Sequence, residues 1–296
     1  TLFNPHDMVG RVGFEPTRFW NSPKSLSDFE RFLSVDLQLG SLTVAAHRRK
    51  IKRFVDWLGK SPLDVSVEDI RRYLEFEKGR AAPKHYVNIL SALRRFYRDF
   101  LRRSDLVESF VFPQIPLRPV QVPTIEELRK FFAVLRDDKW RALFLLFASS
   151  GLRACELLGL KRNDIDLKTR KITPQPHVTA RTKNSPHFTF FNQEAAKYLT
   201  KYLCKRCDND PRLFKICVPA FRRGWKRAAQ RSVVEVYPQG LRRWFCQTLT
   251  DKGVNDRFID FLCGRTARTV LARSYSDYSS DKLKRIYDKA DLRVLR

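Results

Sequence analysis

Residues 150–166 read SGLRACELLGLKRNDID and directly follow a run without charged residues. Apolar periodicity predicts helices at about 138–150 and 153–160. Arg153 therefore lies on an otherwise apolar helix, where burying a positive charge that binds nothing is costly. We take Arg153 as a candidate ligand-binding residue, and the alternative is that it merely pairs with Glu156.

A mixed domain of helices and short strands extends around this stretch. A capping box of Thr124 and Glu127 opens its first helix, at about 124–136. Apolar alternation predicts a few strands next, and helical periodicity returns after them. We place strands near 170–173, 177–182 and 187–191, and further helices at about 193–206, 218–230, 240–252, 255–263, 267–273 and 281–290.

Upstream, residues 25–112 are helical in pattern and poor in glycine and strand signals. The first helix of this domain follows the spacing i, i+3, i+4, i+8. Three more helices follow, which gives a four-helix domain. The markers are Phe29, Phe32, Leu33 and Leu37 for the first helix, Thr43 as cap and Gly59 as end of the second, the capping box of Ser66 and Asp69 for the third, and Pro83 to about Leu101 for the fourth.

Two segments flank the helical domain. Prolines at 113, 116, 119 and 123 predict a stiff, extended linker over 113–123. Residues 1–24 contain three prolines and two glycines without periodicity, and we expect a flexible arm. The predicted organisation is an arm over 1–24, a helical domain over 25–112, the linker, and the mixed domain over 124–296.

The charge balance indicates a polyanionic partner. The chain has 58 Lys and Arg residues against 32 Asp and Glu residues, a net charge of +26. Basic residues that neutralise phosphates release counterions, so this surplus favours nucleic acid. The alternative is a generally basic surface, but many basic residues occur in pairs such as Arg222-Arg223. The candidate DNA-binding residues are Arg48, Arg49, Lys52, Arg53, Arg94, Arg95, Arg98 and Arg243.

No apolar stretch approaches the ~20 residues of a membrane span, and no signal peptide is recognisable. The six cysteines are scattered, mostly in apolar surroundings, which indicates buried thiols in a reduced, intracellular protein. Cys204 and Cys207 have CxxC spacing and Cys217 follows, but a fourth zinc ligand is missing. We expect no metal, with a zinc site as the alternative.

Three later segments complete a constellation with Arg153: Lys183 at the tip of a predicted hairpin, Arg242, and Arg265 with Tyr275 ten residues later. Arginines bind phosphate oxygens bidentately and stabilise charge at phosphorus. A lysine can protonate a leaving oxygen. A tyrosine nucleophile stores the bond energy in a phosphotyrosine ester, so rejoining needs no ATP. Neither a two-metal carboxylate cluster nor a GxxxxGK[ST] loop stands out, and we expect no cofactor.

As an ordered set, these motifs resemble the tyrosine recombinase (phage integrase) family. Gly151-Leu-Arg153-x-x-Glu156-Leu resembles the first arginine box, Leu241-Arg242 the second arginine, and Leu262-x-Gly264 the segment before the second histidine. The resemblance covers about 25–290. It implies an all-α, SAM-like core-binding domain of four helices, and a mostly α catalytic domain with a small antiparallel β-sheet, the DNA breaking-rejoining fold.

The sequence departs from the family pattern at four points, one of them Leu241-Arg242-Arg243 where LRH is usual. Gln239 stands where a histidine is usual, Arg265 replaces a histidine or tryptophan, and Tyr275 follows Arg265 by ten rather than nine residues. An arginine at this position, followed by a tyrosine ten residues later, resembles the pattern in the integrases of archaeal fuselloviruses and related plasmids. Residues 13–16, GFEP, can be encoded by GGN-TTY-GAR-CCN, which accommodates the GGTTCGA of a tRNA T-arm. We expect the arm to be the translation of a DNA attachment site and not a functional peptide. The alternative is that its amino-acid sequence was itself selected for a role in the protein.

The resemblance implies roles for the constellation. Tyr275 would attack the scissile phosphate and hold the 3′ end, with Tyr278 as the competing nucleophile. Arg153, Arg242 and Arg265 would bind the phosphate oxygens, Lys183 would protonate the 5′ oxygen, and Gln239 would at most donate a hydrogen bond, which leaves the general base unassigned.

The implied function is a site-specific DNA recombinase, or integrase, that needs no metal or ATP. It would integrate a viral or plasmid genome at a host tRNA gene, acting in the cytoplasm at the nucleoid. Its partners would be double-stranded attachment sites and copies of itself, four protomers in the synaptic complex. The alternatives are a type IB topoisomerase-like enzyme and a catalytically inactive DNA-binding protein of the same fold. A single methionine hints at a thermophilic host.

Overall fold

The computed structural model describes residues 25–80, 82–116, 119–175, 187–265 and 269–295. The chain divides into two compact units, Thr1–Arg118 and Pro119–Arg296. The division falls inside the segment expected to be a linker. Each unit is described by itself below.

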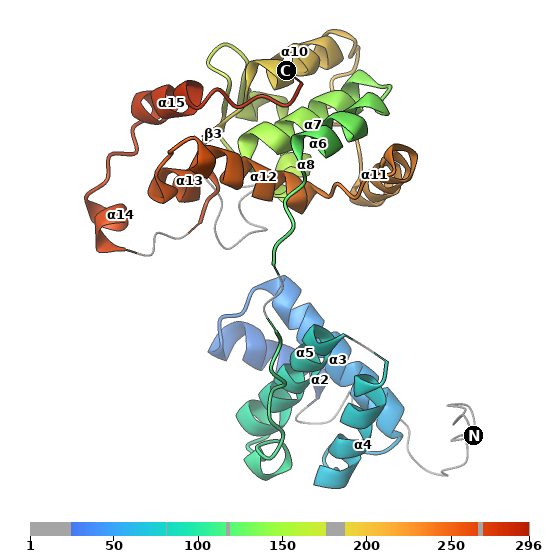
Figure 1. The fold of residues 1–296 in the computed structure, drawn as a ribbon. Coiled ribbons are helices and arrows are strands. Elements are labelled where there is room, and N and C mark those ends of the chain that lie inside the picture. Colours follow the sequence, from blue (N-terminus) through green and yellow to red (C-terminus); the bar gives the residue numbers. More distant parts are fainter. Residues whose placement is uncertain (1–24, 81, 117–118, 176–186, 266–268, 296) are drawn as a thin grey trace. The chain divides into compact units, whose positions relative to one another are not determined.

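The first unit is built from helices alone within its described residues (Figure 1). Two of its helical segments, η2 and η3, are π-helical, and η4 is a short 3₁₀ turn. Its elements are α2 (Leu26–Arg31), η2 (Phe32–Asp36), α3 (Ser41–Leu58), α4 (Val67–Lys78), α5 (Pro83–Arg94), η3 (Arg95–Phe100) and η4 (Ser104–Leu106).

Local capping signals fix several of these helix ends. The predicted box at Ser66 and Asp69 is confirmed, because each side chain accepts a hydrogen bond from the other residue's backbone N–H. Gly59 ends α3 in the left-handed conformation, with φ of 67°. The predicted cap at Thr43 is wrong. Helix α3 starts earlier because the carbonyl of Gly40 already accepts hydrogen bonds from the N–H groups of Thr43 and Val44.

The fourth predicted helix changes its winding. It runs as an α-helix through α5 and continues as the π-helical η3, where the N–H of Leu101 donates to the carbonyl of Phe96 at 2.9 Å. Phe96 is fully buried and lies edge-on to Phe29, with ring centroids 5.1 Å apart. Apolar spacing cannot separate an α turn from a π turn, so this change was not predicted.

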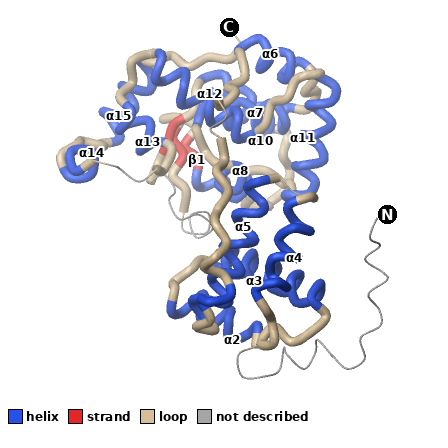
Figure 2. Tube along the Cα trace, turned by 60° about the horizontal axis from the view of Figure 1, so that its bottom comes forward, coloured by secondary structure: helices blue, strands red, loops and turns tan. Residues whose placement is uncertain are grey.

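The second unit is mostly helical with one small sheet, in agreement with the predicted fold class. Figure 2 shows the strands in red among the helices of this unit. Its elements are α6 (Ile125–Ala133), α7 (Asp138–Ser150), α8 (Ala154–Gly159), η5 (Arg162–Asp164), β1 (Ile165–Asp166), β2 (Lys171–Ile172), β3 (Thr189–Phe190), α10 (Gln193–Cys204), α11 (Val218–Ser232), α12 (Pro238–Asp251), α13 (Asp256–Leu262), α14 (Val270–Ser274) and α15 (Ser280–Lys289).

Helix α7 forms the centre of this unit, and α10 and α12 pack against it (Figure 1). Every residue of α7 from Ala142 to Ser150 is buried. The two buried serines, Ser149 and Ser150, donate to the carbonyls of Leu145 and Leu146, so their hydroxyls are satisfied. The apolar run ahead of the first arginine motif is therefore a core helix.

The strands at 170–173 and 187–191 are confirmed in part, as the shorter β2 and β3. The strand expected at 177–182 lies outside the described residues. The sheet is antiparallel in the order β1-β2-β3, with Ile165 opposite Ile172 and Lys171 opposite Phe190. Strand β1 was not predicted, because two residues are too short to show alternation.

Gly151 ends α7 and sets the direction of the chain toward Arg153. Its φ of 66° is left-handed, and a Cβ added there would lie 2.7 Å from the ring of Phe245 and 3.0 Å from the sulfur of Cys263. Both the conformation and the lack of space require glycine. Residue 151 is thus packed directly against the segments that carry the later arginines.

A helix that crosses a bilayer needs about 20 predominantly apolar residues. Within the described part of the chain, no helix combines that length with sufficient apolar character.

Candidate active site

Arg153 lies at the N-cap of α8 and is bound to Glu156 in two ways. Its backbone N–H donates to Glu156 Oε2 at 2.7 Å, and its guanidinium donates to Oε1 at 2.8 Å. Glu156 is fully buried, whereas a third of the Arg153 side chain is exposed. The ion pair between Arg153 and Glu156, which was the alternative considered from the sequence, is therefore present. It leaves part of the Arg153 side chain exposed.

Arg242 lies in α12 and is buried. Its two terminal nitrogens donate to the carbonyls of Gly151 at 2.6 Å and Cys263 at 2.7 Å. Glu156 lies 3.9 Å away. Burial lowers the pKa of Arg242, yet a guanidinium stays protonated in proteins. Arginine has five N–H donors, so these two hydrogen bonds leave donors for an anion.

Arg265 follows Gly264, whose φ of 61° turns the chain after α13. Its guanidinium donates to Asp260 Oδ1 at 3.0 Å and to the sulfur of Cys246 at 3.1 Å. Burial would lower its pKa, but the Cys246 and Cys263 thiols and the Asp260 carboxylate outweigh that and raise the pKa of Arg265. Its side chain is 45% exposed and open to a ligand.

The three arginines belong to one cluster. Arg242 bonds to the residue two positions before Arg153 and to the residue two positions before Arg265. Among the described residues, the carboxylates bonded to or near the three arginines are Glu156 and Asp260. Within that part of the chain the cluster holds more cations than carboxylates. Arginine guanidinium groups are suited to binding phosphate or another small anion.

The other predicted catalytic residues are placed differently. Gln239 is exposed in the first turn of α12, which begins at Pro238 rather than at 240. Lys183 lies outside the described residues. Tyr275 ends α14 and is 77% exposed. Its hydroxyl makes no hydrogen bond to the arginines in the described part of the chain. Figures 1 and 2 both show α14 at the periphery of the second unit.

The competing tyrosine is held by packing. The hydroxyl of Tyr278 donates to the carbonyl of Ala272 at 2.5 Å, and its ring stacks on Phe261 with centroids 4.6 Å apart. Tyr287 is buried, and its hydroxyl donates to the carbonyl of Ser149 at 2.6 Å. Of these three tyrosines, Tyr275 alone is exposed.

The cysteines differ from expectation. Only Cys263 is buried and Cys246 is half-buried, while the remaining four are exposed, so the prediction of mostly buried thiols is wrong. An apolar neighbourhood in sequence does not say which face of a helix a residue occupies. Among the described residues, no group of three or more His, Cys, Asp or Glu side chains could hold a metal ion.

Most candidate DNA-binding residues of the first unit have partners. Arg49, in α3, and Arg243, in α12, are exposed without an ion pair among the described residues. The others pair as follows: Arg48 with Glu30, Lys52 with Asp56, Arg53 with the buried Glu77, and both Arg95 and Arg98 with Asp99, while Arg94 donates to the carbonyl of Phe110 and covers the ring of Phe112 at 4.5 Å.

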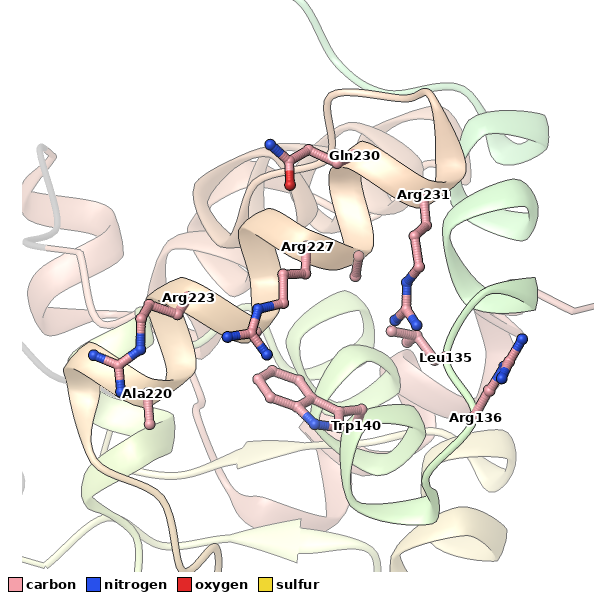
Figure 3. A pocket seen from close by; sticks show the side chains of 10 residues that line it. Leu135, Arg136, Trp140, Ala220, Arg223, Arg227, Gln230 and Arg231 are labelled. Carbon is pink, nitrogen blue, oxygen red and sulfur yellow. The ribbon is translucent and has the colours of Figure 1, made fainter.

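A second basic surface was missed by the sequence analysis. A cavity of about 520 Å³ lies between α11 and the segment joining α6 to α7, and four arginines line it. In Figure 3 the side chain of Arg227 extends from α11 toward Trp140, and that of Arg231 extends toward Leu135. The Trp140 ring packs where a Cβ on Gly224 would lie, 2.3 Å from it. The four arginines are Arg136, Arg223, Arg227 and Arg231, and the described residues form no ion pair with them.

Two signals in the sequence could have indicated the missed residues. Arg223, Arg227 and Arg231 recur every four positions and so share one face of a helix. Cys246 lies one turn after Arg242, and Cys263 lies two residues before Arg265. Their proximity depends on how α12 and α13 pack, which spacing does not reveal.

Both units match known families. Residues 124–280 match the phage integrase family, and residues 26–104 match the phage integrase N-terminal SAM-like domain. Tyrosine recombinase XerA of Thermococcus kodakarensis is 26% identical over 279 residues, covering 90% of this chain and 95% of that protein. Tyrosine recombinase XerC of Bacillus pumilus is 25% identical over 298 residues, covering 90% and 96%.

Solved structures show the same fold. A lambda integrase dimer bound to a COC′ core site superposes with a TM-score of 0.64 at 18% identity, covering 86% of this chain and 95% of that one. The Tn1549 transposon integrase in complex with circular intermediate DNA gives 0.59 at 16% identity, covering 88% and 97%. The predicted fold class and the predicted enzyme class, tyrosine recombinase, are confirmed. On the match that spans residues 124–280, the chain belongs to the phage integrase family.

Proposed function

We propose that this chain is a site-specific DNA recombinase that cleaves and rejoins duplex DNA through a 3′-phosphotyrosyl link at Tyr275. The observation that carries the proposal is the arginine cluster, in which Arg242 donates hydrogen bonds to the chain segments that contain Arg153 and Arg265. Its excess of cations suits a phosphodiester. Tyr275 follows in the chain with an exposed side chain, as a nucleophile for a large substrate requires.

In the proposed step, the Tyr275 oxygen bonds to phosphorus and the bond from phosphorus to the 5′ oxygen breaks. Lys183 gives its proton to the departing 5′ oxygen, and the proton of the phenol passes to water, since Gln239 cannot accept it. Arg153, Arg242 and Arg265 stabilise the charge on the non-bridging oxygens. Rejoining reverses the step, with a 5′ hydroxyl attacking the phosphotyrosine, so no ATP is consumed.

We assign duplex binding to both domains, with 25–112 as the core-binding domain, 124–296 as the catalytic domain and 113–123 as the linker. The net charge of +26 supports DNA as the substrate, with the exposed Arg49 and Arg243 and the four arginines around Trp140 as phosphate contacts. Four protomers would act on two sites, in the cytoplasm at the nucleoid.

The finer proposal is integration of a viral or plasmid genome at a host tRNA gene. It rests on the combination of Gln239, Arg265 and the ten-residue gap to Tyr275, and on the codons of the arm. The arm lies outside the described residues. Sequencing the gene tests the idea, because codons 10–17 should match the 3′ half of a host tRNA gene.

Covalent trapping tests the main proposal. Wild-type protein, Tyr275→Phe and Tyr278→Phe are incubated without metal with nicked suicide duplexes, including one with the candidate tRNA sequence, and resolved on denaturing gels. Tyr278→Phe is the matched control, because it removes a hydroxyl that bonds to a backbone carbonyl. We expect an adduct from wild type and Tyr278→Phe and none from Tyr275→Phe.

The other outcomes distinguish the alternatives. An adduct that survives in Tyr275→Phe and disappears in Tyr278→Phe would move the nucleophile to Tyr278. An adduct with products that are only relaxed in a two-site assay would identify a topoisomerase. Tight DNA binding without an adduct on any duplex, up to high temperature, would identify a catalytically inactive DNA-binding protein.

A further inference from the structure

Two cysteines lie side by side within the arginine cluster. The sulfur atoms of Cys246 and Cys263 are 3.5 Å apart. Cys246 is in α12, one turn after Arg242, and Cys263 is the C-cap of α13, two residues before Arg265. Cys263 is fully buried, and Cys246 is half-buried.

The surroundings favour a reactive thiolate at Cys246. The hydrogen bond from the Cys263 thiol, together with the guanidinium groups of Arg265 and Arg242, lowers the pKa of Cys246 to about 7, although burial opposes this. Arg265 donates to the Cys246 sulfur at 3.1 Å. The hydrogen bond to Cys246, with burial, raises the pKa of Cys263. A half-exposed thiolate next to a protonated thiol is the arrangement of an attacking and a resolving cysteine.

We propose that Cys246 and Cys263 form a reversible disulfide under a hydroperoxide oxidant, and that this bond switches off DNA cleavage at the arginine cluster. The second half of the proposal rests on the function proposed above. The first half depends only on the two sulfurs and their surroundings.

The chemistry balances in two steps. The Cys246 thiolate attacks one oxygen of hydrogen peroxide, the O–O bond breaks, and Cys246 becomes a sulfenic acid while hydroxide takes a proton and leaves as water. The Cys263 sulfur then attacks the Cys246 sulfur, the S–O bond breaks, and a second water leaves with the proton of the Cys263 thiol. The thiols lose two electrons in total and the peroxide gains them. A dithiol reverses the result by exchange.

The disulfide would disturb two phosphate-binding groups. The sulfurs must close from 3.5 Å to a bond length of about 2 Å. The carbonyl of Cys263 accepts a hydrogen bond from Arg242, and Gly264 alone separates Cys263 from Arg265 in the chain. A displacement of Cys263 therefore shifts the guanidinium groups of both Arg242 and Arg265. Oxidation also removes the thiolate that holds the Arg265 guanidinium. Since one misplaced charge-stabilising donor costs about 10²-fold in rate, we expect at least about a tenfold loss of adduct formation.

Peptide mapping tests the bond directly. Trypsin releases Cys246 in the peptide 244–252 and Cys263 in the peptide 258–265, and each peptide holds a single cysteine. Wild-type protein is treated with hydrogen peroxide, alkylated, digested and analysed by mass spectrometry. We expect the two peptides joined, two hydrogens lighter than their sum, and separated by dithiothreitol. Oxidation of the exposed cysteines with Cys246 and Cys263 left as free thiols would overturn the proposal.

The switch is tested in a variant with Cys155, Cys204, Cys207 and Cys217 changed to Ser, which keeps only the paired thiols. Adduct formation is measured before peroxide, after peroxide, and after dithiothreitol. Cys246→Ser in the same background is the matched control, and each variant is compared with its own untreated sample. We expect a reversible loss of activity in the parent and no loss in Cys246→Ser.

A joined peptide without loss of activity, or an equal loss in Cys246→Ser, would overturn the switch. If the reduced protein forms no adduct at all, the proposed function fails, and the mapped peptides still decide whether the disulfide forms.

Discussion

At the scale of single residues, Arg242 is a cation inside the protein whose bonds join three segments. Its guanidinium donates to the carbonyls of Gly151 and Cys263 and lies 3.9 Å from the buried Glu156. A buried charge is costly unless it is paired and hydrogen-bonded. Removing Arg242 would leave two buried carbonyls without these donors, while Glu156 would keep its ion pair with Arg153. Arg242 therefore stabilises the fold in addition to any contact with a phosphate.

We predict that Arg242→Ala lowers the free energy of unfolding of the second unit by about 2–6 kcal/mol, since each of the two buried carbonyls left without a donor costs about 1–3 kcal/mol. Arg243→Ala changes the neighbouring residue, which is exposed, and should stay within about 0.5 kcal/mol of wild type. Urea unfolding followed by tryptophan fluorescence measures both. Equal stabilities for the two variants would contradict the structural part assigned to Arg242.

At the scale of elements, helix boundaries followed local capping chemistry. The boxes at Ser66 and at Thr124 were predicted and are confirmed. The start of α3 was mispredicted, because Gly40 has no side-chain signal and caps through its carbonyl alone. The π-helical segments η2 and η3 were missed, because their apolar residues have the same spacing as an α-helix. An N-cap residue is visible in sequence only where a side chain makes the bond.

The box at Asp69 predicts a pH dependence in the first unit. Burial raises the pKa of Asp69, but the hydrogen bond from Lys60 and those from Ser66 outweigh burial and bring the pKa to about 2. The carboxylate pairs with Lys60 at 2.6 Å. A pKa lowered on folding gives stability that is present above the unfolded value of about 3.9 and is lost as the pH falls through about 2.

We therefore expect the first unit to lose about 1 kcal/mol between pH 4 and pH 2 through this residue, a value reduced for solvent screening. Asp69→Asn should be less stable than wild type at pH 6 and should lose less on acidification. Asp64→Asn, in the segment between α3 and α4, is the control and should lose as much stability on acidification as wild type. Denaturant midpoints across this pH range measure the difference, and parallel curves for wild type and Asp69→Asn would refute it.

At the scale of the whole molecule, the net charge of +26 sets the strength of DNA binding and its response to salt. Each basic residue that contacts a phosphate adds about 0.9 to the slope of log K against log salt. Exposed arginines without carboxylate partners are the ones available for such contacts. The arginines around Trp140 meet this condition among the described residues, whereas Arg212 is paired with Asp210.

We predict that Arg223→Ala with Arg227→Ala weakens DNA binding and reduces the salt slope by about 2. Arg212→Ala, which removes a single positive charge that is already paired with Asp210, should reduce the slope by less than about 1. Binding isotherms on one duplex at several salt concentrations give both slopes. Identical slopes for the double variant and wild type would exclude this cavity from the DNA interface.

The sequence by itself determined the family, the two-part helical architecture, the apolar α7 and the order of the arginine motifs. These are carried by composition, apolar period and capping side chains, which act over a few residues. Only the tertiary structure decided that Arg242 is buried between Gly151 and Cys263, that Cys246 contacts Cys263, and that four arginines line one cavity together with Trp140. These contacts join segments far apart in the chain, and their distances follow from how helices pack, which local periodicity does not encode.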